Sequence, residues 1–461
     1  MREDWVECEF SDVLEIISGK NQKKVVDYDG KYPIYGSGGI IGKANDFLCE
    51  SGTTIIGRKG TINSPIYVRS KFWNVDTAFG LSPLWILNNR LLFFFSVLYN
   101  FTALDKSTAV PSLAKRDLLR IKFPLPPIPI QTSIVAKIEE LFTHLDNGIA
   151  DLKKAQEQLK IYRQAVLKKA FEGDLTKEWR EKQTHLPSAD ELLEQIKLDF
   201  EQLVGSKKKK KEKPLAKIKA EDIPHTIPTK WCWCNFGEVV WFINGDRGKN
   251  YPNRSEYVSS GIPWINTGHI NPDGSLSKEK MNFITIEKFN SLRSGKIEKG
   301  DLVYCLRGAT FGKTAFVEPY TEGSIASSLM IIRSNDKINT KYLYHYLTSV
   351  EGKEQLQRFD NGTAQPNLSA NMVRSYAFPL PSTDEQHQMV QKIESRLSVC
   401  DKVEESIKES LEKAEALRQS ILKKAFEGKL LSSAVIARCK QSKDYEPASV
   451  LLDRIKNGKN G

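Results

Sequence analysis

Apolar residues recur every seven positions along two long stretches of the chain. In the first stretch this register runs through Ile138, Leu141, Leu145, Leu152, Leu159, Tyr162 and Val166. In the second it runs through Met389, Ile393, Cys400, Ile407, Ala414, Leu417 and Ile421. Such a repeat is typical of a helix that packs along one seam, so we predict two long helices, the first over about 131–172. Ser382 and Glu385 have the spacing of a capping box at the start of the second helix, and Gly173 and Gly428 stand where C-cap glycines would.

The two stretches are copies of one another. The heptapeptide LKKAFEG occurs at 167–173 and again at 422–428, and this 255-residue offset holds without insertion back to 124–126 and 379–381. Further upstream the offset shrinks to 249, where Arg58 and Thr61 match Arg307 and Thr310, and to 226, where Gly19 matches Gly245. Surface loops tolerate insertions and packed elements do not. Each half is therefore predicted to be a loop-variable globular domain followed by a helix of fixed length.

The same comparison of the two copies indicates how the long helices pack. Periodicity alone leaves open whether each helix packs on its own domain or on the other helix. Two copies of equal length and register favour an antiparallel coiled coil with pseudo-two-fold symmetry, and small residues at Gly148, Ala155, Ser410 and Ala414 would allow close approach. We assign the globular domains to the α/β (α+β) class, because short strand-like runs alternate with turns and single helix candidates.

The predicted organisation has five segments. They are a first globular domain (1–126), the first long helix with a short following helix (127–205), a lysine-rich linker (206–222), a second globular domain (223–381), and the second long helix with a C-terminal tail (382–461). The run of five lysines from Lys207 to Lys211 is most simply a solvated linker, because like charges repel and resist folding; a phosphate-contacting arm is the alternative.

Composition narrows the class of partner. A net charge of +11 and a pI near 9.0 favour a polyanion, either nucleic acid or an anionic membrane surface. The longest apolar run, Leu91 to Leu98, is too short to span a bilayer, and the first residues lack a signal-peptide apolar region, so we expect a cytoplasmic protein. Seven cysteines without metal-ligand spacing are expected to be reduced core residues.

One loop resembles a nucleotide-binding motif but does not have the spacing that the motif requires. Arg307 to Thr314 resembles a phosphate-binding P-loop, but Gly308 and Gly312 are one residue too close, and the first copy has no Gly-Lys-Thr. An arginine in a glycine-flanked loop suits a phosphate or the acceptor edge of guanine, although it could equally brace a turn. A second shared loop, 108–113 and 362–368, could face a groove or form the corner before the long helix. We find no catalytic or metal-binding constellation.

Together these motifs carry a family resemblance. A variable domain ends in Pro-Leu-Pro and leads into Gln-x-x-Ile/Met-Val-x-Lys-Ile-Glu, a long helix and Arg-Gln-x-x-Leu-Lys-Lys-Ala-Phe-Glu-Gly, and the whole then repeats. This organisation resembles the specificity (S) subunit of type I restriction–modification systems over nearly the full length. The resemblance implies two target-recognition domains that read an asymmetric bipartite site on double-stranded DNA, and paired helices that set the spacer between the half-sites.

The resemblance also implies partners that perform the chemistry. Two methyltransferase (M) subunits would carry S-adenosylmethionine, and a motor/endonuclease (R) subunit would use ATP and Mg²⁺. The chain itself would bind no cofactor and would not be an enzyme. The alternatives are a coiled-coil scaffold with no DNA role or, less readily, a stand-alone nuclease or ATPase.

Residue-level predictions rest on loop context and charge. For DNA contact we select Arg58, Lys59, Arg307, Thr310 and Lys313. For partner docking we select the exposed charges Lys168, Lys169, Lys423 and Lys424, with Phe171 and Phe426 as apolar anchors. The alternative for the two phenylalanines is packing inside the helix pair.

Overall fold

A computed structural model describes residues 2–206, 214–308, 311–359 and 368–459. The chain divides into two compact units. Unit 1 comprises Met1–Lys154 and Ser406–Gly461, and unit 2 comprises Ala155–Glu405. Each unit therefore contains one globular domain, the first part of the long helix that follows that domain, and the last part of the other long helix.

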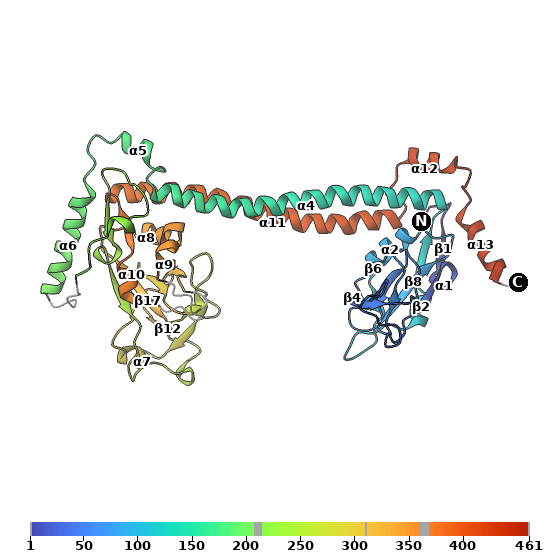
Figure 1. The fold of residues 1–461 in the computed structure, drawn as a ribbon, viewed down its shortest axis with the longest axis horizontal. Coiled ribbons are helices and arrows are strands. Elements are labelled where there is room, and N and C mark those ends of the chain that lie inside the picture. Colours follow the sequence, from blue (N-terminus) through green and yellow to red (C-terminus); the bar gives the residue numbers. More distant parts are fainter. Residues whose placement is uncertain (1, 207–213, 309–310, 360–367, 460–461) are drawn as a thin grey trace. The chain divides into compact units, whose positions relative to one another are not determined.

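The globular domain of unit 1 is built from three small sheets (Figure 1). The central sheet has the order β2-β8-β5-β6, with β2 (Leu14–Ser18), β8 (Ala78–Pro83), β5 (Thr54–Gly57) and β6 (Ile66–Tyr67). A second sheet has the order β4-β3-β7, with β4 (Gly39–Ala44), β3 (Tyr32–Gly36) and β7 (Trp73–Asn74). The third pairs β1 (Val6–Glu9) with β9 (Lys122–Leu125). The helices are α1 (Phe10–Val13), α2 (Asn89–Leu98) and α3 (Lys115–Leu119), with a 3-10 turn at Phe101–Leu104.

Unit 2 repeats this plan. Its central sheet has the order β11-β17-β14-β15, with β11 (Val240–Asn244), β17 (Leu329–Ser334), β14 (Leu302–Cys305) and β15 (Thr314–Phe316). The second sheet has the order β13-β12-β16, with β13 (Asn282–Ile284), β12 (Ile262–Ile265) and β16 (Ser324–Ile325). The third pairs β10 (Cys232–Asn235) with β18 (Ala377–Leu380). The domain's helices are α7 (Ile286–Ser291), α8 (Thr340–Thr348), α9 (Val350–Gln357) and α10 (Ala370–Arg374), with short 3-10 turns at Phe236–Glu238, Arg254–Glu256 and Thr267–His269.

The two long helices are α4 (Ile128–Phe171) and α11 (Thr383–Phe426), each of 44 residues. The helix α4 begins earlier than the predicted residue 131, because Pro129 is tolerated in a first turn whose N–H groups need no intrahelical acceptor. At the start of α11, only the first of the two hydrogen bonds of the predicted capping box forms. The backbone N–H of Glu385 donates to Ser382 Oγ at 3.4 Å, but the Glu385 side chain turns inward to a buried cluster.

Pairing of the helices is antiparallel within each unit. In unit 1, Ile134 and Ile138 near the start of α4 share a core with Ile421 and Leu422 near the end of α11. In unit 2, the end of α4 shares a core with the start of α11 in the same way (Figure 1). The α+β class, the tandem domains and the antiparallel helix pair are therefore confirmed, whereas the pseudo-two-fold relation between the units stays a prediction.

The predicted seam is wrong at Gly148, which is exposed, and at one pair of equivalent positions. Tyr162 and Leu417 are 45% and 50% exposed. Their neighbours Arg163 and Arg418 instead reach the other helix, Arg163 with Nη2 at 2.6 Å from Asp401 Oδ1 and Arg418 in an ion pair with Asp146. The long aliphatic stem of arginine can lie along a helix surface while its charged head stays near water.

Shorter helices follow each long one. They are α5 (Lys177–Glu181) and α6 (Ala189–Gly205) in unit 2, and α12 (Ser433–Lys440) and α13 (Ala448–Lys459) in unit 1; a 3-10 turn at Ala220–Asp222 lies in the connection to the second domain. The lysine run Lys207–Lys211 lies outside the described residues. The five predicted segment boundaries stay predictions.

Candidate nucleic-acid interface

Each globular domain presents a basic loop directly after a buried strand of its central sheet. The first basic loop is Arg58–Gly60, which follows β5, and the second basic loop is Leu306–Gly308, which follows β14. Both loops end in a glycine of positive φ, 80° at Gly60 and 84° at Gly308. A side chain is strained in this conformation, so glycine allows the turn that projects the preceding residue outward.

The backbone hydrogen bonds fix which residues of the two loops are equivalent. In unit 1, Arg58 N–H donates to Thr77 O at 2.8 Å, and Arg58 O accepts from Leu113 N–H at 2.8 Å. In unit 2, Leu306 takes both roles, donating to Ser328 O and accepting from Leu368 N–H. The sequence-based match of Arg58 with Arg307 is therefore wrong by one residue, and the counterpart of Arg307 is Lys59. The sequence comparison matched the two arginines because they are identical. Only the strand register reveals that the true correspondence is shifted by one residue.

The corrected correspondence distinguishes the residue that packs against its own domain from the residue that can contact a ligand. Arg58 is half-buried, with Nη1 at 3.3 Å from Asp76 O and its guanidinium 5.7 Å from the centroid of Phe79. Its counterpart Leu306 is buried. Lys59 and Arg307, by contrast, are both exposed. The exposed pair is therefore the better placed for an external ligand.

Two other segments meet the first basic loop. Gly60 N–H donates to Pro111 O at 2.9 Å, and Lys59 forms a β-bridge with Ser112. The segment 105–112 is itself tied by the Asp105 carboxylate, which accepts from the N–H and hydroxyl of Ser107 and from Ser112 N–H. These hydrogen bonds, led by the Ser107 hydroxyl, lower the pKa of Asp105. The second shared loop of the sequence thus supports the first basic loop as a structural corner and leaves Ser107–Pro111 exposed.

In unit 2 the second basic loop borders a cleft of about 500 Å³. Arg307 and Arg247 both line it, together with Asn244–Asp246, Ser294, Leu306 and Leu368–Ala370. Asp246 is buried, and its carboxylate accepts from Gly248 N–H and Arg293 N–H, each at 2.6 Å. These contacts, the one from Arg293 first, lower the pKa of Asp246 and keep it ionised. Because its oxygens are occupied by the backbone, Asp246 shapes the cleft and leaves the arginines to face a ligand.

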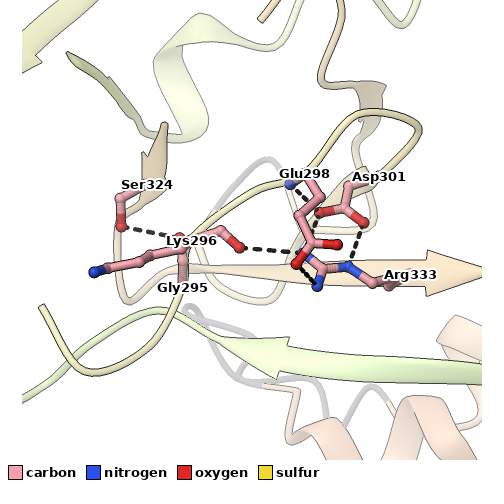
Figure 2. A network of polar contacts seen from close by, with 6 residues as sticks. All are labelled: Gly295, Lys296, Glu298, Asp301, Ser324 and Arg333. Atoms are coloured by element: carbon pink, nitrogen blue, oxygen red, sulfur yellow. Dashed lines mark hydrogen bonds and ion pairs between the residues drawn. The ribbon is translucent and has the colours of Figure 1, made fainter. Parts of the chain in front are cut away.

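A largely buried ion pair holds the segment that follows Ser294 against the central sheet. Figure 2 shows Arg333, on β17, facing Asp301 with two hydrogen bonds of 2.8 Å and also contacting Glu298. The same guanidinium donates to Lys296 O at 3.2 Å, and Ser324 Oγ donates to Gly295 O at 2.9 Å. These contacts clamp segment 295–301 to the sheet. Ser294, the residue before this segment, lines the cleft and donates from its hydroxyl to Asn244 O at 2.7 Å.

The remaining predicted DNA contacts are not gathered at this cleft. Lys313 is exposed, but it lines a separate cavity of about 350 Å³ that also includes Gln164 of α4. No described residue lines both cavities. Thr310 and most of the loop 362–368 lie outside the described residues.

Sequence reasoning missed a second pair of basic segments. Gly19 and Gly245 each come so close to backbone carbonyl oxygens of the following sheet that a Cβ would clash. The exposed residue Lys20 follows the first glycine, and Arg247 follows the second after one residue. The match between the two glycines was visible in the sequence and would have marked both segments. Arg293, exposed beside Asp246, left no signal of this kind.

The predicted docking residues fall into two groups. Lys168, Lys169, Lys423 and Lys424 are exposed, as a docking surface requires. The assignment of Phe171 and Phe426 as apolar anchors for another subunit is wrong, because both are buried in their own units. Their aromatic neighbours belong to the globular domains rather than to the other long helix: Phe171 lies 5.3 Å from Tyr342, and Phe426 lies 5.2 Å from Phe95, between ring centroids.

The exposed side chains of these loops are basic, and the described residues hold no metal-binding cluster beside them. Among the described residues there is no group of three or more His, Cys, Asp or Glu side chains placed to hold a metal ion. Likewise, no described helix is long and apolar enough to cross a bilayer. Exposed lysine and arginine beside positive-φ glycine turns can bind phosphates, and arginine can also read the edge of a guanine.

Known proteins are similar to this chain in sequence and in fold. Residues 2–159 and 228–413 match the family described as "Type I restriction modification DNA specificity domain". The chain is 23% identical to the type I restriction enzyme EcoDI specificity subunit of Escherichia coli over 461 residues, covering 98% of this chain and 95% of that protein. It is 26% identical to the type I restriction enzyme EcoBI specificity subunit of Escherichia coli over 374 residues, covering 80% of this chain and 71% of that protein.

Two solved structures have a similar fold. One comes from work on complex assembly and conformational transition of the type I R-M system, with a TM-score of 0.67, 17% identity, and coverage of 93% of this chain and 99% of that chain. The other is the HsdS subunit from Thermoanaerobacter tengcongensis, with a TM-score of 0.55, 18% identity, and coverage of 93% and 98%. At these identities the likeness shows the fold.

Proposed function

This chain belongs to the type I restriction modification DNA specificity family, and we propose that it is the subunit that reads DNA sequence for a type I restriction–modification complex. One observation carries the proposal. Each unit presents an exposed basic residue at the same position of the same scaffold, Lys59 in unit 1 and Arg307 in unit 2. Two copies of one scaffold with different contact residues suit a target made of two half-sites.

The target is asymmetric. Arginine can donate two parallel hydrogen bonds to guanine O6 and N7, whereas lysine is a flexible point charge. The segments after Gly19 and Gly245 differ as well, with Lys20 in one domain and Asp246 followed by Arg247 in the other. Because the contact surfaces differ in residue type and loop length, the two domains read different sequences.

Partners supply the catalysis. We assign methylation to two methyltransferase subunits that carry S-adenosylmethionine, and translocation and cleavage to a motor subunit that uses ATP and Mg²⁺. The equivalent pairs Lys168–Lys169 and Lys423–Lys424 support two equivalent docking sites, since both lie exposed on the final turn of a long helix. The chain itself acts without catalysis, in the cytoplasm.

The decisive experiment is genome-wide mapping of methyladenine in the host with and without this gene. Loss of methylation from one split, asymmetric motif on deletion is the expected result, and it reads the target directly. Unchanged methylation, together with no salt-sensitive duplex binding by the chain co-expressed with a neighbouring methyltransferase, would overturn the proposal in favour of a scaffold.

A further inference from the structure

A fully buried carboxylate sits where the start of α11 meets the end of α4 in unit 2. Glu385 is 0% exposed. Its Oε1 accepts from Thr176 Oγ1 and Arg180 Nη1, each at 2.7 Å, and its Oε2 accepts from Trp231 Nε1 at 2.8 Å. Arg180 also donates to Gly173 O at 2.8 Å, the carbonyl of the final glycine of LKKAFEG. The segment after α4 is therefore bound to the start of α11 by charge.

The equivalent site of unit 1 has an isoleucine in place of the buried carboxylate, and Arg2 also lines it. At the 255-residue offset, Glu385 is replaced by Ile130, and the partner tryptophan is Trp5. Ile130 and Trp5 line a small cavity of about 10 Å³ together with Leu430, Leu431 and Ile436 from the segment after α11. Ile436 is the fourth residue after its helix N-cap, as Arg180 is after Thr176. Among the described residues no acceptor lies within reach of Trp5 Nε1.

The repeat itself cannot tell the two sites apart. The last turn of α4 and the last turn of α11 have the same seven residues, LKKAFEG, and both bury their leucine, alanine and phenylalanine in a domain core. By these residues alone, the end of α4 could dock on the unit 1 domain of a second copy of the chain. Two chains would then exchange helices.

The neighbouring residues oppose such an exchange. The end of α4 on a unit 1 domain would bury Arg180 against Ile130 with no carboxylate, and the end of α11 on a unit 2 domain would leave Glu385 facing Ile436. A buried charge without its partner costs far more than the pair itself contributes, so each mismatched site is strongly disfavoured. The matched sites, one with the Glu385–Arg180 pair and one with Ile130 against Ile436, carry no such cost.

We propose that Glu385 and Arg180 form a pairing key, which directs the end of α4 to a unit 2 domain and disfavours its exchange onto the unit 1 domain of a second copy. The interaction surface is the junction of α4 and α11 in each unit, and the partner that it accepts is the non-identical half of the duplicated chain. This inference concerns assembly of the chain and does not rest on the proposed function.

The test uses the full chain, unfolded in urea and refolded as a mixture of donor-labelled and acceptor-labelled molecules. Light scattering gives the mass, and energy transfer reports exchange. Wild type is expected to be monomeric with little transfer. The variant E385I/R180I places isoleucine at these two positions in both units, and I130E/I436R places a glutamate–arginine pair there in both units. Each is expected to raise the exchanged-dimer fraction by about tenfold or more, because mismatch no longer buries an unpaired charge.

The combined variant I130E/I436R/E385I/R180I restores discrimination with the key reversed. It is expected to return to the monomer, a result that general destabilisation would not produce. D301N/R333Q is a matched control, because it removes a buried ion pair of unit 2 that lies outside the junction. Monomeric double variants without energy transfer, or equal exchange by the control, would overturn the proposal.

A milder change covers the case in which a double variant fails to fold. E385Q keeps one oxygen that can accept from Trp231, presents an NH2 group that can donate to Thr176 Oγ1, and removes the charge opposite Arg180. Hydrogen exchange of peptides spanning 173–183 and 383–390 is expected to accelerate. The fraction of helix-exchanged dimer is expected to lie between the fractions of wild type and E385I/R180I. Unchanged protection in these peptides would show that the charge does not hold the junction.

Discussion

Single residues separate the part of each basic loop that supports it from the part that can contact DNA. Arg58 packs against Phe79 while Lys59, its neighbour, is exposed, although the two adjacent basic residues look alike in sequence. In unit 2 the buried role falls to Leu306 and the exposed role to Arg307. A charged side chain next to a glycine is therefore informative only once the strand register is known.

Replacing Arg307 by alanine is expected to weaken binding of the assembled complex to its specific target by about 1–3 kcal/mol, the range of one good base contact. Lys313→Ala, in the other cavity of the same domain, is the matched control and should change affinity little. Fluorescence anisotropy with specific and random duplexes measures both. A larger effect from Lys313 would place the contact surface of unit 2 at the second cavity.

A buried histidine makes unit 2 sensitive to pH. Burial on α8 lowers the pKa of His345 to about 4, with Lys341 acting in the same direction and Glu394 opposing it. The unfolded chain, with a pKa near 6.5, binds this proton first, so the unfolding free energy of unit 2 should fall between about pH 6.5 and 4, by up to about 3 kcal/mol. Urea unfolding across this range measures the slope, and His345→Gln should flatten it.

At the level of elements, the long helices are held more by docking onto the domains than by charges between them. The Arg163–Asp401 and Arg418–Asp146 pairs recur at equivalent positions, but their carboxylates are 67% and 61% exposed in the side chain. Exposed ion pairs contribute roughly 0–1 kcal/mol. Phe171 and Phe426, in contrast, are buried among aromatic rings of the domain cores.

Truncating these phenylalanines should therefore matter far more than truncating the arginines. Phe171→Ala is expected to destabilise unit 2, and Phe426→Ala unit 1, each by about 3–5 kcal/mol, because each leaves a cavity in a packed core. Arg163→Ala and Arg418→Ala should cost less than about 1 kcal/mol. Hydrogen exchange resolved by peptide assigns each loss to its unit, and comparable losses from the arginines would contradict this account.

The ion pair between Arg333 and Asp301 is a second feature at the level of elements. Arg333 and Asp301 join β17 to segment 295–301, and Asp301 is only 1% exposed in its side chain. Arg333→Met is expected to destabilise unit 2 by about 3–5 kcal/mol, because it leaves this buried carboxylate without its counter-charge. Urea unfolding measures the loss. Asp301→Asn/Arg333→Met should lose less than the single change if the unpaired charge is the cause.

At the scale of the whole molecule, the net charge of +11 gives a general attraction to DNA of any sequence. The loops add selectivity for particular sequences. Binding of the assembled complex to random duplex should fall steeply with salt, and each phosphate contact removed should lower the slope of log K against log salt by about 1. Lys20→Ala and Lys59→Ala test this for unit 1. A salt slope unchanged by both substitutions would place the phosphate contacts elsewhere on the chain.

The sequence by itself determined the organisation: two loop-variable domains, two long helices of equal length, and the chemistry of a binding protein. Repetition and seven-residue periodicity are local signals, and the constant offset of 255 exposed them without reference to contacts. Only the tertiary structure decided which copies of a motif are equivalent and which side of it is buried. It aligned Lys59 with Arg307, turned Phe171 and Phe426 into the domain cores, and placed Glu385 against Arg180. The physical reason is that burial and charge pairing depend on residues brought together from distant positions, as Glu385 and Arg180 are, and no window of sequence contains both partners.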